Sequence, residues 1–400
     1  MLEFKDSSTV EFGDTESVDS STPVRVFDSL IQEFLSDLSS NIMGSTKAKG
    51  FPDLVSFAFW CRGSNVSLMK KRYSLSDFRI GLGKILHITP RNVPMNFAFS
   101  WALSLLAGNS NYVKLPSKDF TQIDLFLQSY SEVVSSPRYT RIKASTVFFR
   151  TEHSSTLLKL ISARSQARVI WGSDQTIRAI KLLDSPVRSF DLVFPSRLSI
   201  AVISSDIFLS SKSVEKQIIV KRFLQDSLTF GQMGCSSPRM LFWKGNKVSY
   251  KDTRSEFWNL ANALAPNFMQ ITDPYSRLVN LATISIKDSY TLPFTSPLHA
   301  PLITFQADHE FTTSLQDVLS LGTFLEYQVD NYEEIFVSLN RSLQTITYFG
   351  IEPKELLTSI ESLGFLGVDR IVPFGTAYEM TPVWDGTDTI TSLSRIIEIR

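Results

Sequence analysis

Short apolar segments alternate with helix-like stretches through most of this 400-residue chain, and this alternation limits its fold more than any other feature. It begins near residue 83 and repeats about every 25–30 residues, the length of one strand-plus-helix unit. Such units build a parallel sheet with helices on its faces. We therefore predict an α/β fold with strands at residues 84–88, 112–115, 146–150, 168–171 and 198–203.

Helices are predicted at residues 95–107, 174–183 and 214–230. The first is apolar and is followed by Gly108, and glycine commonly ends a helix. Near the amino terminus, Thr22 and Pro23 have the sequence of a helix start, and apolar residues follow at helical spacing. The acidic, Ser/Thr-rich stretch before them is predicted to be a flexible tail.

Parallel sheets of this kind bind ligands beyond the carboxyl ends of their strands. The loops that follow Ile88, Leu115 and Trp171 are therefore predicted to line a cofactor crevice. The sequence contains neither a GxGxxG dinucleotide fingerprint nor a GxxxxGK[ST] phosphate loop. A nucleotide must therefore be held in another way.

Charge and cysteine content exclude several classes of protein. The chain carries 40 basic and 40 acidic residues, whereas a nucleic-acid-binding protein needs a basic face. Cys61 and Cys235 are its only cysteines, too few for a disulfide framework or a cysteine-based zinc site. The four histidines show no metal-ligand spacing, so we expect no metal in the site.

A membrane span is not expected from the hydropathy of the chain. The longest apolar run, near residues 97–107, is about half of the roughly 20 residues that a spanning helix needs. The acidic amino-terminal stretch differs from a signal peptide, which is basic and then apolar. A cytoplasmic protein is therefore expected.

Cys235 lies in the sequence Phe-Gly-Gln-Met-Gly-Cys-Ser-Ser-Pro, directly after the predicted 214–230 helix. The two glycines and the proline predict a tight loop, from which a side chain faces a cleft and backbone N–H groups point at a ligand. This pattern favours a nucleophilic cysteine, and the alternative is a buried apolar thiol, as for most lone cysteines. Cys61 has no such loop and is assigned the second role.

Three other segments carry candidate site residues. Asn92 stands between two prolines, so it is either a rigidly held oxyanion donor or a turn residue. Lys114 is followed closely by a Pro-Ser pair, so it either holds a ribose or phosphate or is an ordinary solvated lysine. Gly172 and Ser173 join a strand to a helix, so they either face a pyrophosphate or form a capped turn.

The order and spacing of these segments resemble the aldehyde dehydrogenase superfamily. In that superfamily a P-x-N-x-P segment supplies the oxyanion amide, a G-N-x-x-V-x-K-P-S-type stretch holds the adenosine ribose, and a G-S turn touches the cofactor. A G-Q-x-C loop then carries the nucleophile. Asn92, Lys114, the Gly172-Ser173 turn and Cys235 follow the same order here.

The chain departs from the superfamily pattern in three places. One extra residue separates Gln232 from Cys235, and Leu115 follows Lys114 where the pattern has proline. The superfamily's E-L-G-G segment, with its general-base Glu, falls near residues 194–198, which read Phe-Pro-Ser-Arg-Leu. A base that activates water would hydrolyse an acyl intermediate, so its absence suits a reductase.

These departures resemble one branch, the acyl-CoA reductases of the bacterial luminescence operon (the LuxC family). The I-T-P-x-N-V-P, G-N-S-N, W-G-x-D-x-T-I and Q-x-x-C-S-S-P segments are similar to that family. Near the carboxyl terminus, Arg370, Pro373, Gly375 and Trp384-Asp385-Gly386 also look similar. The resemblance covers about residues 80–400.

The resemblance implies an aldehyde-dehydrogenase-like α/β fold with a Rossmann-type cofactor domain and an α/β catalytic domain. It implies reduction of a long-chain fatty acyl-CoA to the fatty aldehyde, with NADPH as cofactor. Cys235 is then expected to carry the acyl group, while Asn92 and the backbone N–H of Cys235 stabilise the oxyanion. Cofactor contacts are expected from Ile88, Thr89, Pro90, Lys114, Ser117, Gly172, Ser173 and Ile177.

The expected organisation is a tail at residues 1–22, a cofactor domain at 23–205 and a catalytic domain at 206–372, followed by a segment at 373–400 that returns to the cofactor domain or lies at a subunit interface. The resemblance also implies a homo-oligomer that works with an acyl-protein synthetase and a transferase. Two alternatives stay open. One is an acyl-carrier or acyltransferase subunit that holds the acyl group on Cys235 without reducing it, and the other is an inactive scaffold for an acyl-activating partner.

Overall fold

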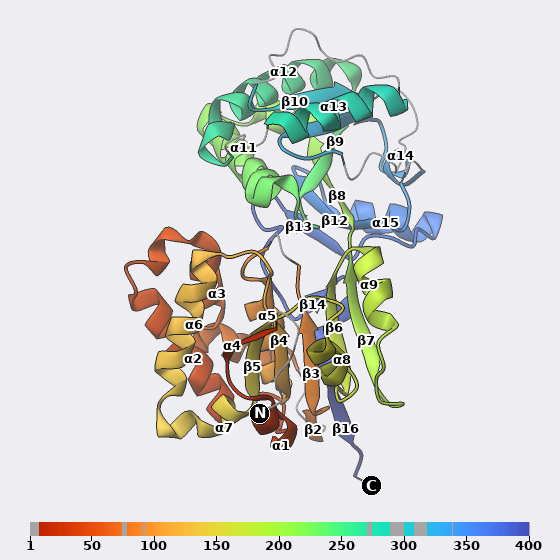
Figure 1. Ribbon diagram of the computed structural model, residues 1–400. Coiled ribbons are helices and arrows are strands. Elements are labelled where there is room, and N and C mark those ends of the chain that lie inside the picture. The colour runs from red at the N-terminus through yellow and green to blue at the C-terminus, as the bar shows by residue number, and fades with distance from the viewer. Residues whose placement is uncertain are drawn as a thin grey trace. The chain divides into compact units, whose positions relative to one another are not determined.

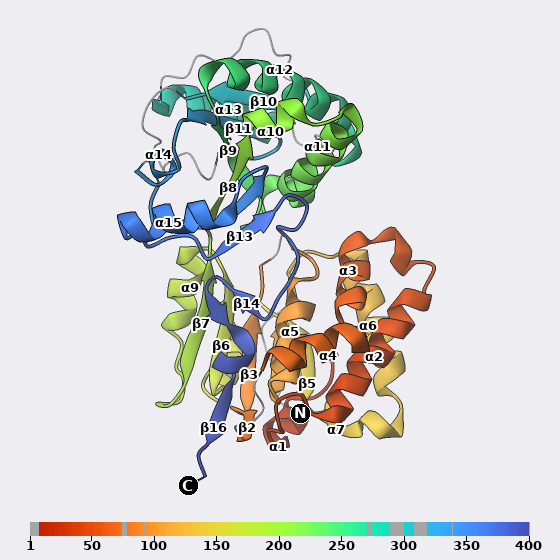
Figure 2. The same cartoon turned by 180° about the vertical axis from the view of Figure 1, so that it is seen from behind.

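The computed structural model describes residues 8–73, 78–90, 93–269, 274–288, 300–307, 318–337 and 339–399. The chain forms two compact units, one made of residues 1–195 and 380–400 and the other of residues 196–379. Each unit is built on a largely parallel six-stranded sheet with helices on both faces (Figures 1 and 2). The predicted α/β fold class is therefore confirmed.

The sheet of the first unit has the strand order β1-β5-β4-β3-β6-β7, in which only β1 is antiparallel to its neighbour. Four of the predicted strands lie in it, with bounds that agree to within two residues. The edge strands β1 and β7 are additional to the predicted set. The strands are β1 (Thr9–Phe12), β3 (Lys84–Ile88), β4 (Ser110–Lys114), β5 (Thr146–Arg150), β6 (Ala167–Gly172) and β7 (Phe190–Pro195).

Helices cover this sheet on both faces because its strands are apolar on both sides. Phe148 of β5 packs in an aromatic cluster with Trp101 and Phe126. Its neighbour Phe149 packs in the hydrophobic core on the opposite face of the sheet. The helices of the unit are α1 (Thr15–Ser20), α2 (Ser29–Gly44), α3 (Pro52–Trp60), α4 (Gly63–Arg72), α5 (Asn96–Leu106), α6 (Thr121–Val134), α7 (Thr140–Ala144), α8 (Thr156–Ser162), α9 (Asp174–Lys181) and α16 (Thr389–Ser392), with the 3-10 turns η1 (Ala48–Gly50) and η2 (Pro137–Tyr139).

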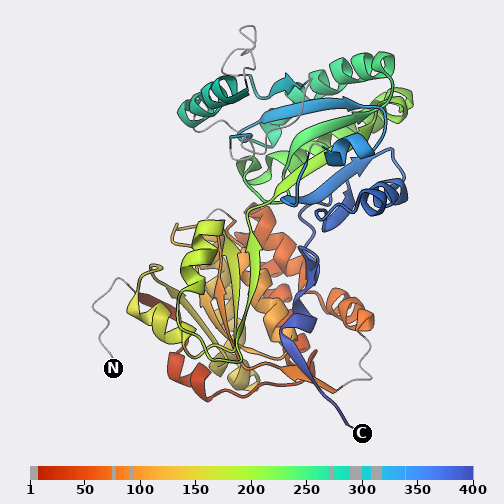
Figure 3. The same cartoon turned by 90° about the vertical axis from the view of Figure 1, so that its right-hand side faces the viewer.

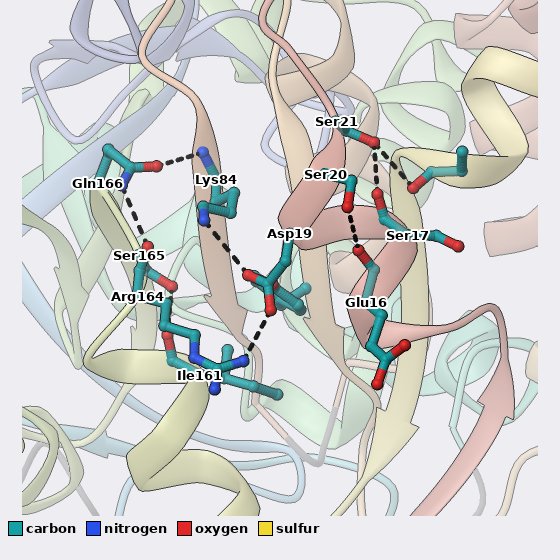
Figure 4. Close-up of polar contacts among 12 residues, drawn as sticks. Glu16, Ser17, Asp19, Ser20, Ser21, Lys84, Ile161, Arg164, Ser165 and Gln166 are labelled. Atoms are coloured by element: carbon teal, nitrogen blue, oxygen red, sulfur yellow. Dashed lines mark hydrogen bonds and ion pairs between the residues drawn. The ribbon is translucent and has the colours of Figure 1, made fainter. Parts of the chain in front are cut away.

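Residues 9–20 form β1 and α1, so the prediction of a flexible tail at residues 1–22 is wrong for this stretch. Asp14 caps α1, because its side chain accepts hydrogen bonds from the backbone of Glu16 and Ser17. Asp19 anchors the helix to the sheet (Figure 4), with contacts of 2.7 Å to Tyr112, 3.3 Å to Lys84 and 2.7 Å to Arg164. The acidic residues that suggested a solvated tail are thus a cap and an anchor.

The next helix, α2, begins at Ser29 after its cap Asp28, whereas the sequence predicts a start at Pro23. Instead, Arg25 forms an isolated antiparallel bridge with Ile80, and Val26 and Phe27 form a turn. The backbone N–H of Val24 donates to Gly108 at 2.9 Å, and its carbonyl accepts from Gly81 at 3.0 Å. These backbone partners outweigh the local helix-start signal.

The carboxyl-terminal residues 380–400 pack with the first unit. They contain α16 and three strands, the last of which pairs with β2 in a two-stranded antiparallel ribbon. The strands concerned are β2 (Phe78–Gly81), β14 (Val383–Trp384), β15 (Thr387–Asp388) and β16 (Ser394–Ile397). Figure 3 shows this blue terminal segment running along the first unit.

The second unit contains an entirely parallel sheet in the order β10-β11-β9-β8-β12-β13. The last predicted strand, at 198–203, belongs here as β8, so the units divide at residue 195 and not at the expected 205. The strands are β8 (Leu198–Ser204), β9 (Pro238–Lys244), β10 (Ile303–Gln306), β11 (Thr323–Val329), β12 (Leu343–Phe349) and β13 (Arg370–Pro373).

Both faces of this second sheet are buried as well. Ala201, Ile203 and Leu241 pack against α10 to α12, whereas Ile200 and Met240 face the core under α13 to α15. The helices are α10 (Ser205–Ser210), α11 (Ser213–Leu228), α12 (Lys247–Leu264), α13 (Pro274–Asp288), α14 (Glu333–Val337) and α15 (Pro353–Leu363), with the turns η3 (Thr229–Gln232) and η4 (Ala265–Asn267). No helix within the described ranges is both long enough and apolar enough to cross a membrane.

Candidate active site

Cys235 lies in the second unit, in the loop between α11 and β9, and its side chain is half-buried. The loop turns sharply because Phe230, Gly231 and Gln232 all have left-handed backbone angles, with φ of 56°, 66° and 64°. Phenylalanine and glutamine rarely adopt this conformation, which persists only where surrounding contacts fix it. The other cysteine, Cys61, is fully buried, and burial raises the pKa of its thiol, which keeps it in the unreactive form.

Buried polar side chains supply the contacts that fix this loop. The amide of Gln232 is fully buried, donates to the carbonyls of Pro238 and Thr323, and accepts from the backbone N–H of Gly322 at 2.9 Å. Ser199 of β8 donates to the carbonyl of Cys235 at 2.6 Å. Because these contacts lie inside the protein, they hold the loop more rigidly than contacts exposed to water would.

Polar groups approach the Cys235 sulfur. The Nε2 of Gln344 lies 3.9 Å from Sγ, and the hydroxyl of Ser236 lies 4.0 Å from it. Arg370 of β13 donates to Ser236 at 3.5 Å and to the carbonyl of Ala377 at 2.8 Å. The thiol is therefore lined by polar groups and is not packed in an apolar core.

Tyr378 packs against the same loop at Gly234 and Ser237. Its hydroxyl is hydrogen-bonded to Ser237, and it lies so close to Gly234 that a Cβ added there would sit 2.1 Å from the hydroxyl oxygen. Glycine at position 234 is therefore required by this contact. Burial raises the pKa of Tyr378, which remains a neutral phenol that donates or accepts hydrogen bonds.

Asp226 of α11 holds the segment that carries Tyr378. Its carboxylate, 1% exposed, accepts hydrogen bonds from the backbone N–H of Gly375 at 2.6 Å and of Ala377 at 3.0 Å. Burial raises the pKa of Asp226 to about 7, although the two backbone donors and Arg370 oppose this shift. The same two hydrogen bonds explain why residues 373–379 belong to the second unit.

The first unit collects most of the predicted cofactor residues at one edge of its sheet. Strands β5, β4, β3 and β6 are parallel neighbours, so their carboxyl ends, at Arg150, Lys114, Ile88 and Gly172, lie along the same edge. Thr89 follows β3 and donates to the carbonyl of Lys114 at 3.0 Å, which joins two of the loops. This edge is where parallel sheets bind ligands.

Lys114 is 5% exposed, which excludes the alternative of an ordinary solvated lysine. Burial and then the charge of Arg150 lower the pKa of its ammonium group. Arg150 is itself paired with Glu11 at 3.3 Å and with Asp119 at 3.5 Å, so its charge is partly neutralised within the protein.

The remaining predicted residues differ in their exposure. Ser173 caps α9, since its hydroxyl accepts from the backbone N–H of Thr176 at 3.2 Å, and Ile177 is buried beneath that first turn. Gly172 is half-buried and Ser117 is exposed, as expected for residues at the strand ends. Pro90 ends the described segment after β3, and Asn92 lies outside the described residues.

The segment that lacks the superfamily's Glu begins with an aromatic contact. Phe194 of β7 stacks on Trp171 of β6, with ring centroids 3.9 Å apart and planes 18° from parallel. Phe194 is 3% exposed, so its side chain belongs to the core of the first unit. Among the described residues no three His, Cys, Asp or Glu side chains gather as metal ligands.

Several residues around Cys235 carry no signal that the sequence alone reveals. Asp226 lies within an ordinary amphipathic helix, and Gln344 within a mostly apolar strand. Tyr378 lies between Gly375 and Trp384, two positions whose similarity to the LuxC family is noted above, and that similarity is the signal by which it could have been found.

Comparison with known proteins gives the family. The sequence model of the LuxC family, described as acyl-CoA reductase, matches residues 67–396. The chain belongs to the LuxC family of acyl-CoA reductases. A curated relative, the long-chain acyl-protein thioester reductase of Photorhabdus laumondii subsp. laumondii, is 24% identical over 297 residues, which are 73% of this chain and 58% of the relative. The chain thus spans less than two thirds of that relative's length.

Solved aldehyde dehydrogenases are similar to this LuxC family member in fold. A lactaldehyde dehydrogenase superposes with a TM-score of 0.66 and 13% identity, over 92% of this chain and 85% of that chain. PnpE from Pseudomonas sp. WBC-3 gives a TM-score of 0.65 and 12% identity, over 95% and 87% of the two chains. PnpE has also been solved in complex with nicotinamide adenine dinucleotide. The aldehyde-dehydrogenase-like fold implied by the sequence is confirmed.

Proposed function

We propose that this protein reduces a long-chain fatty acyl thioester to the fatty aldehyde, with the acyl group held on Cys235 and NADPH as cofactor. The observation that supports this function most is a half-buried thiol, contacted by polar groups, in a loop that buried side chains hold rigid. Membership of the acyl-CoA reductase family supports the assignment of acyl transfer to that thiol.

Acyl transfer to Cys235 is the first step. The thiolate attacks the carbonyl carbon, a new C–S bond forms, and the original C–S bond breaks with its electron pair leaving on the departing thiol. Exchange between thioesters is nearly thermoneutral, and the product anchors the substrate in the site. The departing thiol is that of CoA or of an acylated protein, since the Photorhabdus relative is named for an acyl-protein thioester.

Acylation and reduction each pass through an oxyanion. We assign its stabilisation to the side-chain amide of Asn92 and the backbone N–H of Cys235, as the family pattern implies. One such donor contributes about 3–4 kcal/mol to transition-state stability. The rigid loop described above keeps the Cys235 N–H preorganised for this role.

The cofactor is assigned to the first unit and catalysis to the second. Lys114 fits the 2′-phosphate or ribose of NADPH, because a buried ammonium attracts an anion. The amino terminus of α9, with Gly172 and Ser173, suits the pyrophosphate. When bound, the nucleotide supplies the hydride that reduces the acyl carbon. Collapse of the resulting hemithioacetal returns the C–S electron pair to Cys235 and releases aldehyde.

Partners are proposed from the family resemblance. An acyl-protein synthetase would supply the acyl group, and several copies of this chain would assemble into a homo-oligomer.

The test is to mix the protein with fatty acyl thioesters of increasing chain length, on CoA and on a carrier protein. The absorbance of the reduced nicotinamide is followed, and the product is identified by mass. Loss of NADPH together with aldehyde formation supports the proposal. Acylation of Cys235 without NADPH loss would indicate a carrier or transferase. The absence of both acylation and NADPH loss would indicate a scaffold.

The choice of nucleotide is tested with Lys114→Ala and a matched control, Lys143→Ala, whose exposed side chain lies on α7 at the other end of the strands. The first variant should lose the preference for NADPH over NADH, and the second should keep it. A preference for NADH in the parent protein, unchanged in Lys114→Ala, would contradict this assignment.

A further inference from the structure

Strand β12 has an irregular register with β8 at its first residues, next to the loop at residues 229–237 that carries Cys235 (the cysteine loop). Leu343 pairs with Leu198 and Thr345 pairs with Ser199, so two steps along β12 correspond to one step along β8. Gln344 is the inserted residue of this bulge. Bulges of this kind re-aim a side chain and are common beside active sites.

The side chain of Gln344 is fully buried and directed at the nucleophile. Its Nε2 donates to Cys235 Sγ at 3.9 Å, while its Oε1 accepts from the hydroxyl of Thr345 at 3.4 Å. The backbone carbonyl of Gln344 accepts from Asp369 at 2.8 Å, which fixes the bulge to the start of the next strand. With its oxygen held by Thr345, the amide presents its N–H to the sulfur.

Other charged and titratable groups around the loop act less directly. Arg370 of β13 reaches Ser236, and Tyr378 reaches Ser237, whereas Asp226 contacts backbone N–H groups behind Tyr378. The charge of Arg239 of β9 acts to lower the pKa of Tyr378, and the charge of Glu379 acts to raise the pKa of Asp226. Gln344, by contrast, places an amide nitrogen against the sulfur itself.

We propose that Gln344 stabilises the thiolate of Cys235 by donating its amide N–H to the sulfur. This role rests on the proposed function of Cys235. It favours both steps in which the thiolate takes part. Before attack it raises the fraction of ionised thiol, and during aldehyde release it stabilises the sulfur that receives the electron pair of the breaking C–S bond. A hydrogen bond to the charged form of a group favours that form.

The test measures the alkylation rate of Cys235 by iodoacetamide as a function of pH, in a Cys61→Ala background so that a single thiol reacts. Gln344→Met keeps the length and approximate volume of the side chain but has no N–H. We expect it to raise the midpoint of the alkylation profile by about one pH unit, equivalent to about a tenfold loss of thiolate near neutral pH. Gln225→Met, on the exposed side of α11, is the matched control and should leave the midpoint unchanged.

Gln344→Glu provides a second variant in case the methionine protein does not fold. A carboxylate facing the sulfur repels the thiolate, so the midpoint should rise further. Folding of each variant is checked by circular dichroism. An unchanged midpoint in a folded Gln344→Met or Gln344→Glu protein would overturn this role, even if the variant reduced acyl thioesters more slowly. Absence of acyl transfer to Cys235 in the parent protein would instead contradict the proposed function.

Discussion

Single residues around Cys235 act mainly by positioning one another. Asp226 holds the backbone at Gly375 and Ala377, this segment presents Tyr378, and Tyr378 bonds to Ser237 in the cysteine loop. A change at Asp226 should therefore alter the position of Cys235 although the two residues are not in contact. The buried carboxylate also makes this connection sensitive to pH.

The pKa of Asp226 predicts how stability depends on pH. Its folded-state pKa is raised from the ordinary 3.8 to about 7, so the folded protein binds this proton more tightly than the unfolded chain. The resulting stabilisation is complete below about pH 4 and is lost as pH rises through about 7. The melting temperature of the parent protein minus that of Asp226→Asn should therefore increase as pH falls from about 8 to about 5. A difference that stays constant over this range would show that Asp226 titrates normally.

Gly234 predicts a steric effect. An alanine there would place its Cβ 2.1 Å from the Tyr378 hydroxyl, so Tyr378 or the loop must move. We expect Gly234→Ala to cost about 1–3 kcal/mol of unfolding free energy and to slow acylation of Cys235. Tyr378→Phe in the same chain should restore part of both. Gly44→Ala, where no atom lies within 4 Å of the added Cβ, is the control, and equal behaviour of the two alanine variants would refute the contact.

Candidate site residues can be predicted from the sequence where their neighbours in the chain are unusual, but not where their neighbours are ordinary. Cys235 lies among glycines and a proline, Gly172 is itself a glycine between an apolar strand and a helix, and Lys114 precedes a Pro-Ser pair, so local composition marks them. Asp226 has the appearance of a solvated residue on a helix, because burial depends on the distant segment at 375–377. The bulge at Gln344 depends on the register between β12 and β8, which no local pattern specifies.

At the scale of elements, the apolar strands are the most predictable part. Strands β5, β6 and β8 are buried on both faces and stand out by their apolar runs. Strands β3 and β4 are also buried but include polar residues such as His87 and Asn111. Strand β7 is less evident because it contains Asp191, which in the structure forms an ion pair with Arg168 at 2.6 Å. Strand β1 and helix α1 are held by partners far away in the sequence, so local composition misrepresents them.

The anchor of α1 can be tested by itself. Burial disfavours the charge of Asp19, but the hydrogen bond from Tyr112 and the contacts with Lys84 outweigh it and hold the pKa of this carboxyl below its usual range. Asp19→Asn should lower the unfolding free energy by about 1 kcal/mol and make residues 9–20 easier to cleave by proteases. Asp119→Asn, whose carboxylate is 95% exposed, is the control and should have little effect. Equal protease resistance of the two variants would contradict the anchor.

At the scale of the whole molecule, the family resemblance implies two α/β parts, and the structure contains two largely parallel sheets. The boundary near residue 195 could not be located from sequence, because β7 and β8 follow each other closely and differ only in the sheet they join. The resemblance to the LuxC family is confirmed, and the fold is that of the aldehyde dehydrogenases.

The missing general base makes a prediction about the complete reaction. Residues 194–198 contain no carboxylate, and Phe194 is packed against Trp171, so no Glu stands in this segment to activate water. Given fatty aldehyde, NADP⁺ and CoA, the protein should form acyl-CoA in the reverse reaction. Without CoA, formation of free acid should be slow. Rapid acid formation without CoA, identified by mass, would mean that another residue activates water.

The central claim is that Cys235 carries the acyl group during reduction. The most direct measurement is the mass of the peptide at residues 231–239 after the protein is mixed with a long-chain acyl-CoA in the absence of nucleotide. This peptide should gain the mass of the acyl group, and added NADPH should remove that mass and release the aldehyde. Cys235→Ala should abolish both results, whereas Cys61→Ala should preserve them. Acyl mass on any other residue, or an acylated Cys235 that NADPH leaves unchanged, would contradict the account.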